Sequence, residues 1–258
     1  MTPAAAVPAA ATLFAMILGL LPPAPTDSPK TLQLQPGDQI LCAGDSITAS
    51  GGYVRYIDAV LRTNYPDLKL PPVQKSGVVG QRSDGLVARF DKAVLAKKPA
   101  LVTVAIGIND VGGSRRGQPL DPQHIEAFRK SITEMVDKAQ KAGIRIMLLT
   151  PTCFGESPTT EENQRLEKFI AVEKEIAAQK HCELVDLHQL FMDAIEKRGG
   201  KTPRLTRDGV HMKDPGDAIM AIGVLRALGV PDDKIAATEA PPPPPKAGKK
   251  SPAAATTP

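Results

Sequence analysis

Short apolar runs alternate with amphipathic helical patterns between residues 40 and 228, and this alternation constrains the fold of the chain most strongly. The clearest run, residues 101–106 (LVTVAI), follows Pro99, which ends a helical pattern over residues 83–97. Further strands are predicted at residues 40–43, 73–75, 144–149 and 183–187. Strands separated by helices form parallel sheets that are covered on both faces. The sequence therefore predicts an α/β protein with a central five-stranded parallel sheet.

The helical patterns carry recognisable start and stop signals. Asp121 and Pro122 are suited to the cap and first turn of a helix that ends near Gly143, and Asp214 is expected to cap the last helix. The predicted helices cover residues 53–61, 83–97, 122–143, 160–179 and 215–228. In such folds the active site gathers at the carboxyl ends of the strands, so the loops that follow the strands become the places to search for function.

Both ends of the chain differ in composition from its middle. Residues 1–29 contain an apolar, Ala-rich run followed by prolines, which is typical of a secretory signal peptide, although the first basic residue is Lys30; a retained Ala-rich anchor is the alternative. Residues 234–258 are a Pro-rich tail that is predicted to be disordered. Residues 30–233 are therefore expected to form one folded domain of an exported protein, periplasmic or extracellular, without a stable membrane span in its mature form.

Composition excludes several classes of partner. The formal net charge is only +4, aromatic residues make up 3% of the chain and tryptophan is absent, so neither a nucleic-acid surface nor base stacking is expected. The three cysteines are widely spaced, which does not suit a metal site. Cys153 and Cys182 are predicted at opposite ends of neighbouring strands, roughly 15 Å apart, so no disulfide is expected between them.

Two distant segments together carry the residues for nucleophilic acyl transfer. Ser46 follows the first strand in the sequence Gly44-Asp45-Ser46, and His211 lies three residues after Asp208 in a loop. A serine hydroxyl becomes a good nucleophile when an imidazole takes its proton, and a carboxylate holds that imidazole in the required tautomer. Taken alone, Asp45 or Ser46 could equally be the cap of the following helix.

Two further loops offer groups that could stabilise an oxyanion. Gly80 lies in the loop after the second strand and could present a backbone N–H, although a simple turn that needs a positive φ explains an isolated glycine as well. Asn109, in Gly107-Ile108-Asn109-Asp110, follows the third strand and would place an amide donor in the same cleft. Asp110 is assigned no catalytic role.

These segments in this order resemble the SGNH hydrolases, also called the GDSL lipase/acylhydrolase family, over about residues 37–230. The resemblance implies a three-layer α/β/α flavodoxin-like fold. It also implies Ser46 as nucleophile, His211 as general base and Asp208 as its orienting carboxylate. The oxyanion hole would consist of the N–H groups of Ser46 and Gly80 and the side chain of Asn109. The chain departs from the family at Lys75-Ser76, where many members carry an asparagine.

The sequence therefore predicts a serine esterase that needs no metal or organic cofactor and acts as a monomer on small-molecule or carbohydrate esters. Short acyl groups, especially carbohydrate O-acetyl esters, are favoured because no long apolar lid lies between the motifs. A lysophospholipase or thioesterase with the same triad is the first alternative. A non-catalytic carbohydrate-binding protein on the same fold is the second.

Overall fold

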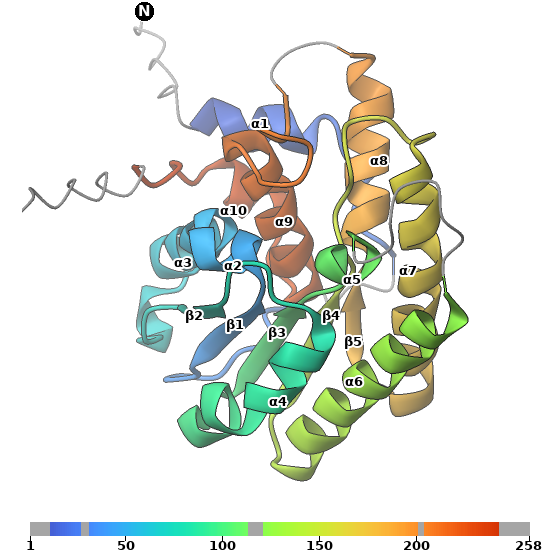
Figure 1. Ribbon diagram of the computed structural model, residues 1–258. Helices are drawn as coiled ribbons and strands as arrows, with labels where there is room; N and C mark the ends of the chain where they lie inside the picture. Colours follow the sequence, from blue (N-terminus) through green and yellow to red (C-terminus); the bar gives the residue numbers. More distant parts are fainter. Residues whose placement is uncertain (1–10, 27–30, 113–120, 201–203, 243–258) are drawn as a thin grey trace, which may run out of the picture.

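A computed structural model describes residues 11–26, 31–112, 121–200 and 204–242 (Figure 1). At its centre lies a five-stranded, fully parallel sheet with the strand order β2-β1-β3-β4-β5. The strands are β1 (Ile40–Gly44), β2 (Gln74–Gly77), β3 (Leu101–Ala105), β4 (Arg145–Leu149) and β5 (Glu183–Val185). The predicted five-stranded parallel sheet is thereby confirmed.

Helices cover both faces of this sheet, as Figure 1 shows. One face carries α3 (Gly52–Asn64), α8 (Leu187–Arg198) and α9 (Asp214–Ala227), and the other carries α4 (Ser83–Ala93), α6 (Pro122–Lys141) and α7 (Glu161–Lys180). Successive strand side chains divide between the two apolar layers: Ile40 and Cys42 pack on the α9 side, Leu41 and Ala43 on the α6 side. This alternation follows from the two-residue period of a strand and explains why the strands are apolar throughout.

The strand register brings the ends of four strands, β1 to β4, to one level. Gly44 pairs with both Gly77 and Ala105, and Ala105 pairs with Leu149. The loops that follow β1, β2 and β3 therefore start side by side at the carboxyl edge of the sheet. Two short helices begin there, α2 (Ser46–Ser50) after β1 and α5 (Ile108–Gly112) shortly after β3.

Several element boundaries differ from the sequence prediction. Asp121 caps α6 as predicted, its side chain accepting from Gln123 N–H at 2.9 Å. The predicted cap at Asp214 is wrong by one position, because α9 begins at Asp214 and Lys213 is its cap residue. Strand β5 is shorter than predicted because Asp186 caps α8, a helix that the sequence analysis missed, and accepts from Gln189 N–H at 3.0 Å. The helical pattern over residues 83–97 divides into α4 and the 3-10 helix η2 (Leu95–Lys97); a second 3-10 helix, η1 (Pro66–Leu68), follows α3.

Folded structure continues on both sides of the predicted domain limits. Helix α1 (Ala11–Leu18), inside the predicted leader, packs on α9 and α10 (Asp232–Ala236), and α10 itself crosses the predicted limit at residue 233. The side chains of Phe14 and Ile17 are fully buried, and Phe14 meets the ring of Tyr56 edge-on at 5.3 Å. The predicted disordered tail lies outside the described residues from 243 onward. No helix in the described ranges is long and apolar enough to cross a membrane.

All three cysteines are free: Cys42 and Cys153 are buried and Cys182 is half-buried.

Candidate active site

Ser46 is the first residue of α2 and lies two residues after the end of β1, an inner strand of the sheet. Its neighbour Asp45 is the helix cap, with Oδ1 accepting from Ile47 N–H at 2.9 Å. A side chain at Gly44 would lie 2.4 Å from Ala105 O, so only glycine allows this close turn. The capping alternative is therefore correct for Asp45, while the hydroxyl of Ser46 remains available for another partner.

That partner is His211, which lies next to Ser46 in the fold although 165 residues separate them in the sequence. His211 Nε2 lies 2.9 Å from Ser46 Oγ, and Nδ1 lies 2.7 Å from Asp208 Oδ2. The other oxygen of Asp208 accepts from the backbone N–H groups of Val210 and His211 at 3.0 and 2.7 Å. Because an ionised carboxylate can only accept, Nδ1 carries the proton and Nε2 is free to accept from the serine hydroxyl.

Charge stabilisation at Asp208 follows from these contacts. Burial alone would raise its pKa, but the hydrogen bonds from the N–H and ring of His211 and from Val210 N–H lower the pKa to about 2. Asp208 is thus ionised throughout the neutral range. Asp45 behaves oppositely: burial raises its pKa to about 6, against the lowering effects of Ile47 N–H and nearby His211.

The loop that carries Asp208 and His211 is stabilised by contacts between its two ends and by contacts with residues 155 and 156. Thr206 pairs with Met212 in an antiparallel bridge, and Gly155 N–H donates to Gly209 O at 2.7 Å. The buried carboxylate of Glu156 accepts at 2.9 Å from both the N–H and the hydroxyl of Thr206 and forms an ion pair with Arg198. Sequence reasoning missed Glu156, since no local pattern connects it with a loop 50 residues away.

The three predicted oxyanion donors lie on the loops that start from the same edge of the sheet. Ser46 is the first residue of α2, and no hydrogen bond from its N–H or that of Gly80 to another described residue is found. Gly80 has φ +70° in the turn closed by Gln81 N–H to Val78 O at 3.1 Å. Asn109 Nδ2 donates to Gln81 O at 2.9 Å, which uses one of its two N–H groups and leaves the other.

Two neighbouring residues have structural partners. Asp110 is buried and accepts from both the N–H and the hydroxyl of Ser83, so it ties α5 to the start of α4. Burial raises the pKa of Asp110 against these hydrogen bonds. Lys75, where the chain departs from the family pattern, donates to the Ala49 and Ser50 carbonyls at the end of α2. It therefore binds the carboxyl end of the short helix that carries Ser46.

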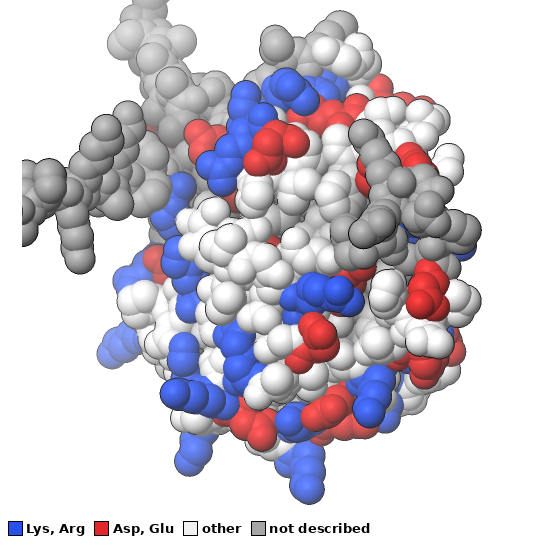
Figure 2. All heavy atoms as spheres, in the orientation of Figure 1, with Lys and Arg blue, Asp and Glu red and all other residues white. Residues whose placement is uncertain are grey.

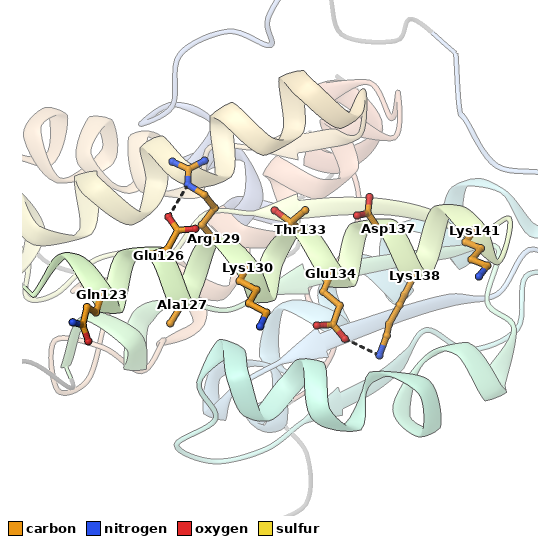
Figure 3. A pocket seen from close by; sticks show the side chains of 10 residues that line it. All are labelled: Gln123, Glu126, Ala127, Arg129, Lys130, Thr133, Glu134, Asp137, Lys138 and Lys141. Carbon is orange, nitrogen blue, oxygen red and sulfur yellow. Dashed lines mark ion pairs between the residues drawn. The ribbon is translucent and has the colours of Figure 1, made fainter.

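A broad hollow of the surface lies away from these residues. It runs along the outer side of α6, and Figure 3 shows its charged side chains, among them the Glu134–Lys138 pair at 3.1 Å. None of the predicted site residues lines it. A cavity of about 10 Å³ adjoins Asp45 and Ile47 instead. In Figure 2 charges of both signs are interspersed over the face shown, and the part over α2 is mostly uncharged. No cluster of three His, Cys, Asp or Glu side chains suited to a metal ion occurs within the described ranges.

A three-layer α/β/α fold with serine, histidine and aspartate in hydrogen-bond contact at the carboxyl edge of the sheet is an arrangement typical of serine hydrolases. The model of the GDSL-like Lipase/Acylhydrolase family matches residues 42–219. The chain therefore belongs to this family of SGNH hydrolases, and it is a carboxylic ester hydrolase.

Named relatives agree with this assignment. The chain is 26% identical over 215 residues to an acetylxylan esterase of Geobacillus stearothermophilus, covering 77% of this chain and 97% of the relative. It is 28% identical over 178 residues to esterase TesA of Pseudomonas aeruginosa, covering 67% and 78%. A solved structure of the Geobacillus enzyme, Axe2, superposes with a TM-score of 0.69 at 26% identity over 78% of this chain and 98% of Axe2. The catalytic mutants of Axe2 include replacements of a serine, an aspartate and a histidine by alanine.

Proposed function

We propose that the protein is a serine esterase that removes acetyl groups from carbohydrate esters. The observation that carries the proposal is the continuous hydrogen-bond chain from Ser46 Oγ through the imidazole of His211 to Asp208, at 2.9 and 2.7 Å. A general base must lie within hydrogen-bond reach of the proton that it removes, and His211 meets this condition with its tautomer fixed by Asp208.

The reaction proceeds through an acyl-enzyme. Ser46 Oγ forms a bond to the ester carbonyl carbon while its proton passes to His211 Nε2, and the carbonyl electron pair moves onto oxygen. The N–H groups of Ser46 and Gly80 and the amide of Asn109 bind that oxyanion. Collapse of the intermediate expels the sugar alkoxide, which takes the proton from His211. Water then repeats the sequence on the acyl-enzyme, releasing acetate and restoring the Ser46 hydroxyl.

The surface near the site and the named relatives support an acetyl group on a neutral carbohydrate. The surface over α2 carries few charges in Figure 2, which suits an uncharged sugar better than a polyanion. The relatives named acetylxylan esterases support the same substrate class.

A longer acyl chain is the second candidate, and one feature favours it. Val78 and Val79 are 44% and 78% exposed in the turn that carries Gly80, so apolar surface is available beside the proposed oxyanion site. TesA, a relative named only as an esterase, leaves this possibility open. The two candidates differ in the dependence of the rate on acyl length.

The test is hydrolysis of p-nitrophenyl acetate, butyrate and octanoate, together with acetate release from acetylated xylo-oligosaccharides. Ser46→Ala should lose at least about 1,000-fold in kcat, whereas Ser50→Ala, at the exposed end of the same helix, should keep wild-type activity. Rates that fall with acyl length support deacetylation, and rates that rise support the second candidate. Residual activity of Ser46→Ala within tenfold of wild type would exclude Ser46 as the nucleophile.

Export as a monomer is part of the proposal. It is supported by the apolar run in residues 4–21, followed by Pro22-Pro23. Removal of residues 1–29 would remove α1 together with the hydrogen bond from Arg226 to Pro22 O at 2.9 Å. Amino-terminal sequencing of enzyme recovered from the medium or periplasm tests export, and light scattering after size-exclusion chromatography tests the monomer. A cytoplasmic enzyme that keeps residues 1–29 would contradict export.

A further inference from the structure

We propose that Arg89 is a positioning residue that fixes the oxyanion-binding loops relative to Ser46. This inference rests on the proposed function, because it concerns the donors that stabilise the tetrahedral intermediate. Arg89 lies on α4, outside the motifs that define the site. Its hydrogen bonds go to Gln81, Ser76 and Gly44 rather than to Ser46, His211 or Asp208, so its effect is exerted through the backbone segments that it binds.

The guanidinium of Arg89 binds three separate segments. Nε donates to Gln81 Oε1 at 2.8 Å, and Nη1 donates to Ser76 Oγ at 2.9 Å. Nη2 donates to Ser76 O at 2.8 Å and, at a longer 3.4 Å, to Gly44 O. These contacts use the planar fork of donors that distinguishes arginine from lysine.

Each of these segments leads to one of the proposed oxyanion donors. Gly44 lies two residues before Ser46, and Ser76 lies near the end of β2, four residues before Gly80. Gln81 directly follows Gly80, and its carbonyl accepts from Asn109 Nδ2 at 2.9 Å. Arg89 is thus connected to Ser46 and Gly80 through short stretches of backbone, and to Asn109 through Gln81.

Backbone hydrogen bonds and close packing also join the turn that carries Gly80 to β1 and α2. Val78 N–H donates to Gly44 O at 3.1 Å, and Gln81 N–H donates to Val78 O at 3.1 Å. A side chain at Gly77 would lie 2.2 Å from Ala49 N, so β2 passes very close to the helix that carries Ser46. The turn with Gly80 is therefore packed against α2 on one side and bound by Arg89 on the other.

The side chain of Arg89 is half-buried, so its position is restricted by the surrounding protein. Burial lowers the pKa of Arg89, yet guanidinium remains charged at every pH of interest, so its hydrogen bonds persist. Carbonyl, amide and hydroxyl oxygens accept from its N–H groups in place of water. A lysine would present one compact ammonium on a flexible stem and could not bind Gln81, Ser76 and Gly44 together.

Oxyanion donors must be placed within about half an ångström, and loss of a single donor costs roughly 100- to 1,000-fold in kcat. Loosening the loops should cost less than complete removal of a donor. We expect Arg89→Lys to lower kcat by about 10- to 100-fold while KM changes by less than twofold, because ground-state binding does not depend on these donors.

The experiment compares p-nitrophenyl acetate with its thiono analogue, in which sulfur replaces the carbonyl oxygen. Sulfur is a poor acceptor for oxyanion donors, so the wild-type preference for the oxygen ester measures their alignment. Wild type, Arg89→Lys and Gln81→Met are assayed as full chains. Gln81→Met removes the acceptor of Arg89 Nε but keeps the carbonyl that binds Asn109. Arg129→Lys is the matched control, since Arg129 on α6 forms its ion pair with Glu175 on α7 and not with the loops that bind Arg89.

We expect Arg89→Lys and Gln81→Met to lower the ratio of the rate on the oxygen ester to the rate on the thiono ester. Arg129→Lys should leave this ratio unchanged. If Arg89 had a purely structural role, the site variants would hydrolyse the oxygen ester and the thiono ester more slowly by the same factor, and their melting temperature would fall. That result would overturn the proposal. Arg89→Lys with kcat within twofold of wild type would overturn it as well. Turnover that survives in Ser46→Ala would overturn the proposed function itself and this inference with it, which distinguishes the two failures.

Discussion

Asp45 provides a direct test of how burial and capping compete beside the nucleophile. Its side chain is 2% exposed, and burial raises its pKa from 3.8 to about 6. A shift of about two pH units corresponds to about 3 kcal/mol, at 1.36 kcal/mol per unit. Because the folded-state pKa is raised, folding favours the neutral acid: the penalty is absent below about pH 4 and complete above about pH 6.

Asp45→Asn should remove this penalty and keep the cap, because asparagine caps helices as well as aspartate does. We expect the variant to exceed wild type in free energy of unfolding by up to about 3 kcal/mol at pH 8, and to match it at pH 4. At a urea m-value of about 2 to 3 kcal/mol per molar, the midpoint should rise by about 1 M at pH 8. Far-UV circular dichroism is the suitable signal because the chain lacks tryptophan.

Asp121→Asn is the matched control. Asp121 also caps a helix, with the same 2.9 Å contact to the N–H two residues later, but its side chain is exposed. An exposed carboxylate loses no hydration on folding, so this substitution should change stability by a few tenths of a kcal/mol at every pH. An Asp45→Asn gain that is absent at pH 8, or equal at pH 4 and pH 8, would refute the assignment of the shift to burial.

Two further substitutions test how the site loops are stabilised. Gly107→Ala should lower the melting temperature by several degrees, because Gly107 has φ +118° and a Cβ there would lie 2.7 Å from Pro151 Cγ. Gly143→Ala, at φ +70° with no atom within 4 Å of the added Cβ, should lower the melting temperature less, and equal losses would contradict the steric argument. Glu156→Ala should destabilise the fold by about 1 to 3 kcal/mol in urea unfolding, since it removes the carboxylate that accepts from the N–H and hydroxyl of Thr206, and wild-type stability would contradict this reading.

The fold could be predicted because its signals are local. An apolar run such as residues 101–106 is buried on both faces and can hardly be anything but a central strand of a parallel sheet, which β3 is. The residues at which strands and helices begin and end were harder to predict. The apolar residues of β5 are followed, after Asp186, by another apolar residue, Leu187, so the sequence does not show where the strand ends. The hydrogen bond from Gln189 N–H to Asp186 shows that a helix has begun.

The supports of the site could not be predicted, for a physical reason. Ser46, Asp208 and His211 are marked by short motifs because their backbone geometry is local, as in the contacts of Asp208 to Val210 and His211. Arg89 and Glu156 act across the fold, on Gly44 and Thr206, at separations of 45 and 50 residues. A half-buried arginine on an amphipathic helix has no sequence signature that separates it from a solvated one.

The two aspartates near His211 show why residue type and proximity do not by themselves define the triad carboxylate. Both interact favourably with the charge of His211, yet the environment drives their pKa values apart, to about 6 for Asp45 and about 2 for Asp208. Asp208 is half-exposed and accepts two N–H groups besides the ring, so it stays ionised and aligned on Nδ1 at 2.7 Å. Asp45 is buried and accepts from Ile47 N–H to hold α2. The sequence singles out Asp208 by its spacing from His211, and the difference in solvation explains why that carboxylate, rather than the one beside Ser46, is suited to orient the base.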